Sequence, residues 1–284
     1  MNKKMITEQL GFWTLRLCVG LVGLILLLIL FDIVSKGIGT ISWRFLTQPP
    51  KNGMTEGAIF PAKVGTFFVT ILTAVLAVPL GMGCAIYLNE YADDNIFTRI
   101  IRMSIRNLSG VPSIVYGLFG VVLFVQMMRI GTCLLASGLT LGLMTLPWTI
   151  TASEEALKNV PQSYRDGALA LGATKWQAIK TNVLPYSISG MLTGTILGLA
   201  RAAGETAPIL FTGAAFFLPF LPKSLFEQFM ALPYHLYIMA TQHHAIETVR
   251  PIAYATALVL IVLICSMNMF AVVLRYKLRK RKKE

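Results

Sequence analysis

Two oppositely charged residues, Arg201 and Glu205, lie four positions apart in the apolar stretch GLARAAGETAPIL, residues 198–210. A charge inside a membrane helix is costly and is usually paired or functional. A spacing of four places both side chains on one helix face. The pair is therefore either a structural ion pair or a functional charge pair, and both alternatives stay open.

Composition predicts the helices that must position these charges. The chain has 284 residues, of which 55 % are hydrophobic and 13 % charged, against about 25 % charged in ordinary soluble domains. A membrane-spanning helix needs roughly 20 consecutive, mainly apolar residues. We therefore predict an all-α integral membrane protein with six transmembrane helices. The predicted spans are 12–35, 64–88, 107–128, 133–151, 187–212 and 252–274.

The net charge of +12 predicts the orientation, because Lys and Arg collect on the cytoplasmic side of membrane proteins. With both termini in the cytoplasm, the inner segments hold 17 of the 25 Lys and Arg residues. These segments include a cytoplasmic loop at 152–186 and a basic cytoplasmic tail at 275–284. The tail directly follows a predicted span, so we do not expect it to bind nucleic acid. The four cysteines lie in apolar segments without metal-ligand spacing, and we expect no metal site.

The loop at 152–186 has the pattern of two short helices bent at a glycine. Gly172 suits the left-handed residue that ends a first helix, and Thr174 with Gln177 forms a capping box for a second one. Pro185 marks a further break before the fifth span. The helix pair either docks in a groove on a partner or packs on its own membrane domain.

This loop resembles the inner-loop signature of ABC importer permeases, which is Glu-Ala-Ala, three residues, Gly, nine residues, then Ile-x-Leu-Pro. The segments DGALALG, ATKWQAIKT and NVLP reproduce that spacing. The matching positions are Asp166, Gly167, Ala168, Gly172, Leu184 and Pro185. Asp166, Gly167 and Asn182 depart from the usual residue types. The resemblance implies a type I ABC importer permease fold, with a coupling helix that sits in a groove of a cytoplasmic ATPase.

Three further segments, 44–66, 107–120 and 200–212, resemble the permeases of phosphate ABC transporters. The resemblance implies a subunit of an ATP-driven inorganic phosphate importer in the bacterial cytoplasmic (inner) membrane. Its partners would be a second permease, two ATPase subunits, an extracytoplasmic phosphate-binding protein, phosphate itself and membrane lipid. The sequence has no phosphate-cradling G-x-x-x-x-G-K-[S/T] motif. We therefore expect no cofactor on this chain, with ATP and Mg²⁺ bound by the partner ATPase, and no enzymatic activity of its own.

Two other functions stay open. The cargo could be another oxyanion, such as sulfate or molybdate. The chain could also work alone as an ion-coupled transporter or channel, although such proteins are built from internal repeats and none is visible beyond hydropathy.

For phosphate, we expect the translocation path at Arg201, Glu205 and Thr206. A glutamate fits an anion path because phosphate at neutral pH still carries a proton, which a carboxylate accepts in a hydrogen bond, whereas sulfate carries none.

We also predict hinge or gate positions at Gly204, Pro208 and Pro112. Gly204 would permit close approach of a neighbouring helix, Pro208 would kink the fifth span, and Pro112 would break the third one. Small residues and prolines also serve plain helix packing. His235, His243 and His244 fall in the outer loop, and we expect them to be solvated.

Overall fold

The computed structural model describes residues 3–56 and 58–280, and within these ranges the chain is helical, with two isolated bridges in place of strands. The all-α prediction is therefore confirmed. The first elements are α1 (Lys3–Gly37), η1 (Ile38–Thr40), α2 (Trp43–Thr47), η2 (Asn52–Met54), α3 (Phe60–Ile86), η3 (Tyr87–Tyr91), α4 (Ile96–Leu108), α5 (Ser113–Gly120) and η4 (Val121–Met127). The remainder are α6 (Leu134–Lys158), α7 (Gln162–Ala170), α8 (Lys175–Ala178), η5 (Ile179–Val183), α9 (Leu184–Gly204), α10 (Ala207–Thr212), α11 (Leu232–Thr241) and α12 (Ile246–Lys280).

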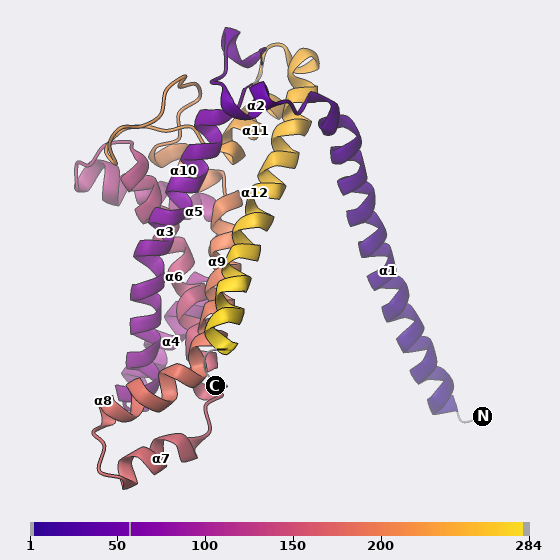
Figure 1. The fold of residues 1–284 in the computed structure, drawn as a ribbon. Coiled ribbons are helices and arrows are strands. Elements are labelled where there is room, and N and C mark those ends of the chain that lie inside the picture. Colours follow the sequence, from indigo (N-terminus) through magenta and orange to yellow (C-terminus); the bar gives the residue numbers. More distant parts are fainter. Residues whose placement is uncertain (1–2, 57, 281–284) are drawn as a thin grey trace.

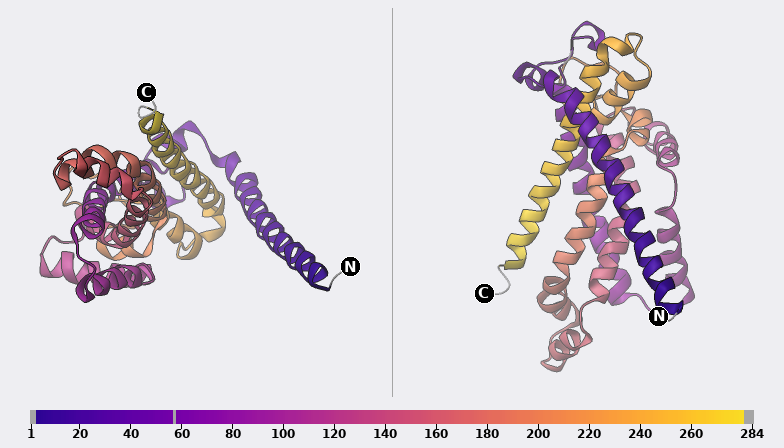
Figure 2. Two further views of the ribbon diagram at one scale, coloured as in Figure 1. Left: turned by 90° about the horizontal axis from the view of Figure 1, so that it is seen from below. Right: turned by 90° about the vertical axis from the view of Figure 1, so that its right-hand side faces the viewer.

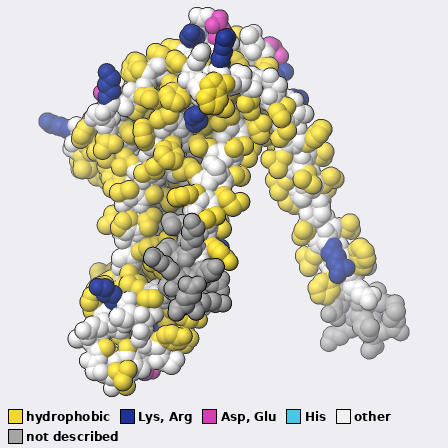
Figure 3. All heavy atoms as spheres, in the orientation of Figure 1, with side chains coloured by type: hydrophobic (Ala, Val, Ile, Leu, Met, Phe, Trp, Pro, Cys, Tyr) yellow, Lys and Arg dark blue, Asp and Glu magenta, His cyan; other side chains and the backbone are white. Residues whose placement is uncertain are grey.

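Five helical segments in the described ranges are long and apolar enough to cross a membrane. A sixth is possible if α4 and α5–η4, which are bent by 105°, form one broken span. The start of α1 and the end of α12 lie toward the same end of the structure as α7 and α8 (Figure 1). We call this the α7 end. Hydrophobic side chains cover the middle of the bundle and α1, while charged side chains lie mostly toward the two ends (Figure 3).

The described helices differ from the predicted spans: α1 and α12 extend beyond the predicted 12–35 and 252–274, and three further differences concern the middle of the chain. The predicted span 107–128 is broken, because α4 ends at Leu108 and α5 begins only at Ser113. The predicted span 187–212 is also broken, since α9 ends at Gly204 and α10 begins at Ala207. The span predicted at 133–151 continues as helix to Lys158, so part of the predicted 152–186 loop is helical. Hydropathy averages over a window and does not register a two- to four-residue break.

Helices α3, α6 and α9 form the centre of the bundle and pack through small residues. A Cβ atom on Gly190 would lie 2.9 Å from the Cβ of Ala156, and Gly194 meets Ala152 still more closely. Helix association in membranes depends on such close approach, because lipid tails are as apolar as the side chains. The small-residue contact fixes α9 against α6 along the segment that leads to Arg201.

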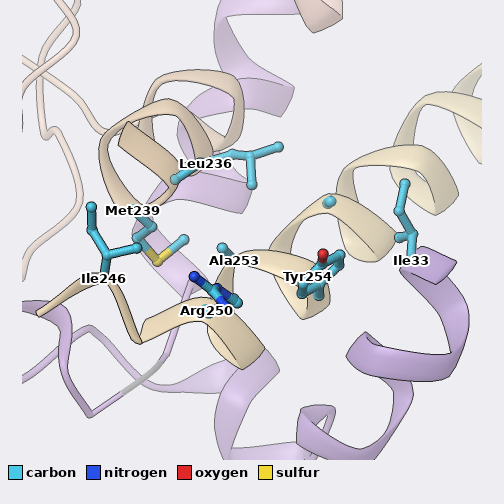
Figure 4. A pocket seen from close by; sticks show the side chains of 9 residues that line it. Ile33, Leu236, Met239, Ile246, Arg250, Ala253 and Tyr254 are labelled. Carbon is cyan, nitrogen blue, oxygen red and sulfur yellow. The ribbon is translucent and has the colours of Figure 1, made fainter. Parts of the chain in front are cut away.

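Helix α1 diverges from the bundle, and its described part approaches the bundle only near Gly37, at the end opposite the α7 end (Figures 1 and 2). There, Gly37 approaches the backbone of Tyr254 on α12, so closely that an added Cβ would lie 2.8 Å from the Tyr254 carbonyl oxygen. Ile33 of α1 faces a depression between α11 and α12, where Arg250 and Tyr254 also lie (Figure 4). The apolar side chains along α1 are otherwise exposed.

The end opposite α7 is closed by a cap made of residues 38–56, 58–59 and 213–245. Phe45, Met54, Met230 and Leu232 form much of its core with the start of α12. His243 is buried, and its Nδ1 accepts a hydrogen bond from the Ala245 N–H (3.1 Å). The tautomer is therefore Nε2–H, which donates to the Gly53 carbonyl oxygen at 2.8 Å. This bond holds a turn in which Asn52, Gly53 and Met54 all have positive φ.

The prediction of solvated histidines is wrong for two of the three. His235 and His243 are buried in the cap and only His244 is exposed. They lie on or next to α11, which shares an apolar core with residues of the cap and the start of α12, and loop position alone did not indicate this packing. Burial, with a smaller effect of His243, lowers the pKa of His235 to about 4.

Acidification is expected to destabilise the cap through His235. Between pH 6.5 and pH 4 the unfolded chain binds a proton that the folded chain excludes, so the free energy of unfolding falls by about 1.4 kcal/mol per pH unit. Above pH 6.5 this contribution is constant. Thermal unfolding of the purified protein at pH 7 and pH 5 measures the loss. His235→Phe should reduce it and His244→Ala, on an exposed ring, should not. An equal loss in the Phe variant would contradict the assignment.

Candidate functional site

The break between α9 and α10 lies at Glu205 and Thr206. Glu205 leaves the helix with φ −75° and ψ 135°, and Pro208 lies in the first turn of α10. Proline has no N–H to donate to the carbonyl of Gly204, and it is well tolerated in a first helical turn. The sequence is thus compatible with a new helix at this point. The predicted kink at Pro208 is corrected to a full break just before it.

Arg201 and Glu205 contact each other across the end of α9. Arg201 Nε lies 3.2 Å from Glu205 Oε1, and the two side chains are 47 % and 15 % exposed. The Arg201 guanidinium also lies over the ring of Trp148 on α6, with its Cζ 5.5 Å from the ring centroid. The acid is therefore largely covered, while about half of the cation is left at the surface of the chain. Half-exposed, this cation has donors available for a ligand.

The structure brings the predicted break at Pro112 close to this pair. Ser109, Val111, Tyr116 and Trp148 line a small depression together with Arg201. Pro112 precedes the first residue of α5, which confirms the predicted helix break there. The Leu108 carbonyl oxygen, at the end of α4, accepts from the Val111 N–H at 3.1 Å and from the Tyr116 hydroxyl at 2.9 Å.

The two broken helices also contact each other directly. A Cβ on Gly117 would lie 3.1 Å from the Cα of Pro208, so α5 packs tightly on the start of α10. Thr206 is half-buried in the connection. Gly204 was expected to permit the close approach of a neighbouring helix. Within this chain that expectation is wrong, because a Cβ there would lie 3.7 Å from Ile264, which is ordinary contact. Its role as a hinge, like the path and gate roles of the other residues, stays a prediction.

The second candidate site is the helix pair α7 and α8. Gly172 follows α7 with φ +82°, a conformation that favours glycine. Thr174 accepts from the Gln177 N–H, and the Gln177 side chain accepts from the Thr174 N–H, so the predicted capping box is confirmed. Asn182, which departs from the family pattern, donates to the Tyr164 carbonyl oxygen at 3.3 Å. This hydrogen bond ties the two helices together.

Most residues of the inner-loop signature are accessible on this pair. Asp166, Gly167 and Gly172 are exposed, Ala168 is buried, and Leu184 and Pro185 are half-buried. Leu171, next to the turn, is 91 % exposed, and Tyr164 and Leu169 add further exposed apolar surface. The break predicted at Pro185 is wrong, because helical structure continues from Lys175 to Gly204 with a π-helical turn at 179–183. Such a turn changes the hydrogen-bond register before the proline.

A buried ion pair anchors α7 to the membrane helices. Arg165 Nη2 donates to Glu90 Oε1 at 2.6 Å and Nε donates to Oε2 at 3.1 Å. The same guanidinium donates to the carbonyl oxygens of Leu157 and Val160 at the end of α6. Sequence analysis missed Glu90, which lies 75 residues before Arg165. The available signal was an acidic residue directly after an apolar span.

These features define a polytopic helical membrane protein with broken helices around a charged pair and an exposed helix pair at one end. Residues 77–280 match the family described as the binding-protein-dependent transport system inner membrane component. The chain belongs to that family and is a permease subunit of an ABC importer.

Known relatives agree with this assignment. The chain is 34 % identical, over 75 % of its length and 72 % of the relative's, to the probable ABC transporter permease protein YqgI of Bacillus subtilis (strain 168). It is 32 % identical to the phosphate transport system permease protein PstA of Mycobacterium leprae (strain TN), over 88 % and 82 % of the two chains. Its fold is similar to a chain of a bacterial ABC transporter involved in the import of the acidic polysaccharide alginate, with a TM-score of 0.67, 11 % identity and coverage of 97 % and 99 %.

Glu90→Ala should destabilise the protein by about 3–5 kcal/mol, because it leaves the buried Arg165 charge without its partner. The matched control is Asp94→Ala, which breaks the exposed pair between Asp94 and Arg99 and should cost about 0–1 kcal/mol. Thermal unfolding measures both, and protease cleavage within 162–172 reports whether α7 is released. Equal, small effects would show that the Arg165–Glu90 pair does not anchor α7.

Proposed function

We propose that this permease subunit forms one half of the transmembrane path of an ATP-driven inorganic phosphate importer in the bacterial inner membrane. The observation that carries the proposal is the Arg201–Glu205 pair at the break between α9 and α10, in a chain whose relatives include phosphate permeases. The second permease subunit would complete the path. An extracytoplasmic phosphate-binding protein would deliver the anion to the cap, and two ATPase subunits would bind ATP and Mg²⁺. The 152–186 segment and both termini would lie in the cytoplasm.

The charge pair fits the chemistry of phosphate. The half-exposed guanidinium of Arg201 supplies several parallel donors to phosphate oxygens and stays protonated. Glu205, held beside it, accepts a hydrogen bond from the P–OH group. A fully deprotonated tetrahedral anion such as sulfate offers no such proton and is repelled by the carboxylate. This discrimination favours phosphate over the sulfate and molybdate alternatives.

The broken helices suit a gate. Non-helical backbone at membrane depth is tolerated where protein or a water-filled cavity covers it. The break at 109–112 lines the Arg201 depression through Ser109 and Val111, and the break at 205–206 carries Glu205, which pairs with Arg201. The helices after the two breaks, α5 and α10, pack on each other through Gly117 and Pro208. A rotation of α10 against α9 would open or close the path on the cap side while the buried parts of α9 stay packed on α6.

Coupling to ATP hydrolysis would pass through α7. Its exposed surface around Leu171, Leu169 and Tyr164 has the amphipathic character of a helix that docks in a groove. The Arg165–Glu90 pair links any movement of α7 to η3, at the end of α3, and Arg165 also bonds the end of α6. The ATPase subunits would thus move the two helices that pack on the Arg201-bearing α9. A transporter working alone has no evident need for this exposed, anchored helix pair.

Arg201→Gln is expected to abolish uptake at normal membrane abundance, because it removes the charged donors that face the anion. The measurement is radiolabelled phosphate uptake in cells lacking this protein, restored with wild type or variant, with excess sulfate as competitor. Equal restoration by both would make Arg201 structural. Uptake that never depends on the protein would exclude phosphate as its cargo.

Glu205→Gln is expected to weaken the selection of phosphate over sulfate, because the amide no longer repels an anion that has no proton. In the same cells, sulfate in excess should compete with phosphate uptake by the variant and leave wild-type uptake unchanged. The control is Glu247→Gln, which alters an acid paired with Arg250 at the start of α12. Unchanged discrimination in Glu205→Gln would contradict the proposed role of the carboxylate.

A further inference from the structure

Helix α4 carries three arginines on one face. Arg99, Arg102 and Arg106 are spaced by three and four residues, so they fall within about 60° around the helix axis at 100° per residue. The apolar residues Phe97, Ile101 and Leu108 lie on the other side. Helix α4 therefore presents a cationic stripe that runs from the α7 end toward the break at 109–112.

Two of these arginines are engaged in ion pairs and one is not. Arg99 forms a two-bond pair with Asp94 at 3.0 and 3.1 Å. Arg102 contacts Glu154 on α6 at 2.7 Å and donates to the Leu88 carbonyl oxygen. Arg106 is exposed and has no ion-pair partner within 4.0 Å among the residues that the structure describes. Its charge is available to a ligand.

Arg106 lines a depression between α4 and α6. The facing α6 residues are Thr151, Glu154, Glu155 and Lys158. Thr151 and Glu155 lie three and seven positions after Trp148, so they continue the α6 face over which Arg201 lies. At 1.5 Å per residue they are about 5 and 10 Å nearer the α7 end than Trp148. The depression is thus the next polar position along the same face.

The charges in this depression nearly balance. Glu154 is neutralised by Arg102 at 2.7 Å and by Lys158 at 3.0 Å. Among the described residues, Glu155 forms no ion pair within 4.0 Å, so Arg106 and Glu155 remain as an uncommitted cation and carboxylate. They repeat the chemical pair of Arg201 and Glu205 but are not joined to each other. Conduction requires such a site to attract an ion and yet release it, and a carboxylate beside the arginine limits the affinity.

We propose that Arg106, with Thr151 and Glu155, forms a second transit site for a protonated tetrahedral oxyanion, between Arg201 and the α7 end of the path. Arg106 donates to the anion's oxygens, the Thr151 hydroxyl donates a further hydrogen bond, and Glu155 accepts from the anion's O–H group. This inference rests on the proposed phosphate path. It adds an inner site to that path.

The test uses the complete importer, reconstituted in vesicles with its ATPase and phosphate-binding subunits. Arg106→Gln should lower the rate of phosphate uptake by about tenfold or more, the effect of losing a hydrogen bond from a charged donor. The phosphate concentration for half-maximal uptake should stay unchanged, because the binding protein captures phosphate before it reaches Arg106. ATP hydrolysis stimulated by the binding protein should also persist, so the phosphate moved per ATP should fall.

Arg99→Gln is the matched control, because it removes the same charge from the same helix face. Arg99 belongs to the exposed pair with Asp94, so phosphate uptake by this variant should equal that of wild type. Uptake by Arg106→Gln equal to wild type, with Arg201→Gln inactive, would overturn the inner site and leave the proposed function standing. If Arg201→Gln is also fully active, the proposed path itself is wrong. A defect of Arg106→Gln that disappears in vesicles of neutral phosphatidylcholine would assign Arg106 to an anionic lipid headgroup and overturn the proposal.

Discussion

The structure depends on one constraint, which is that every backbone polar group inside a bilayer needs a hydrogen-bond partner within the protein. Helices meet this requirement by themselves, and any interruption has to be compensated. Within the described residues, helices are broken at 109–112 and at 205–206, and the helices that follow these breaks, α5 and α10, pack closely through Gly117 and Pro208. At the first break the Leu108 carbonyl oxygen accepts from the Val111 N–H and the Tyr116 hydroxyl. Both breaks lie near the half-exposed Arg201.

The charges of the bundle fall into two classes that differ in burial. Arg165–Glu90 and Arg102–Glu154 are largely buried and join separate helices near the α7 end. A buried pair adds little net stability, but losing one partner is expensive, so such pairs fix how neighbouring helices are placed. Arg201 and Arg106 are more exposed and retain free donors. The buried pairs therefore hold neighbouring helices in place, while the two exposed cations keep donors that these pairs do not use.

The helix pair α7–α8 and the Arg201 site are connected through rigid contacts. Arg165 ties α7 to the ends of α3 and α6, and α6 packs on α9 through Ala152, Ala156 and two glycines. The capping box and the Asn182 hydrogen bond keep the pair from folding back. These contacts form a continuous connection from α7 to the helix that carries Arg201. The cap shares its apolar core with the start of α3 and of α12 and contains two buried histidines.

The sequence alone determined the properties that local chemistry controls. Apolar runs predicted the membrane helices, the Gly172 turn and the capping box followed from residue types and spacing, and Arg201 and Glu205 were placed together by a four-residue separation. The tertiary structure alone decided which distant residues meet. Several features join segments that are tens of residues apart. They are the pairing of Arg165 with Glu90, the burial of His235 and His243, the packing of α5 against α10 and the position of Arg106 opposite Glu155. Such contacts depend on how whole helices pack, and no local pattern of hydropathy or spacing encodes the position of a partner on another helix.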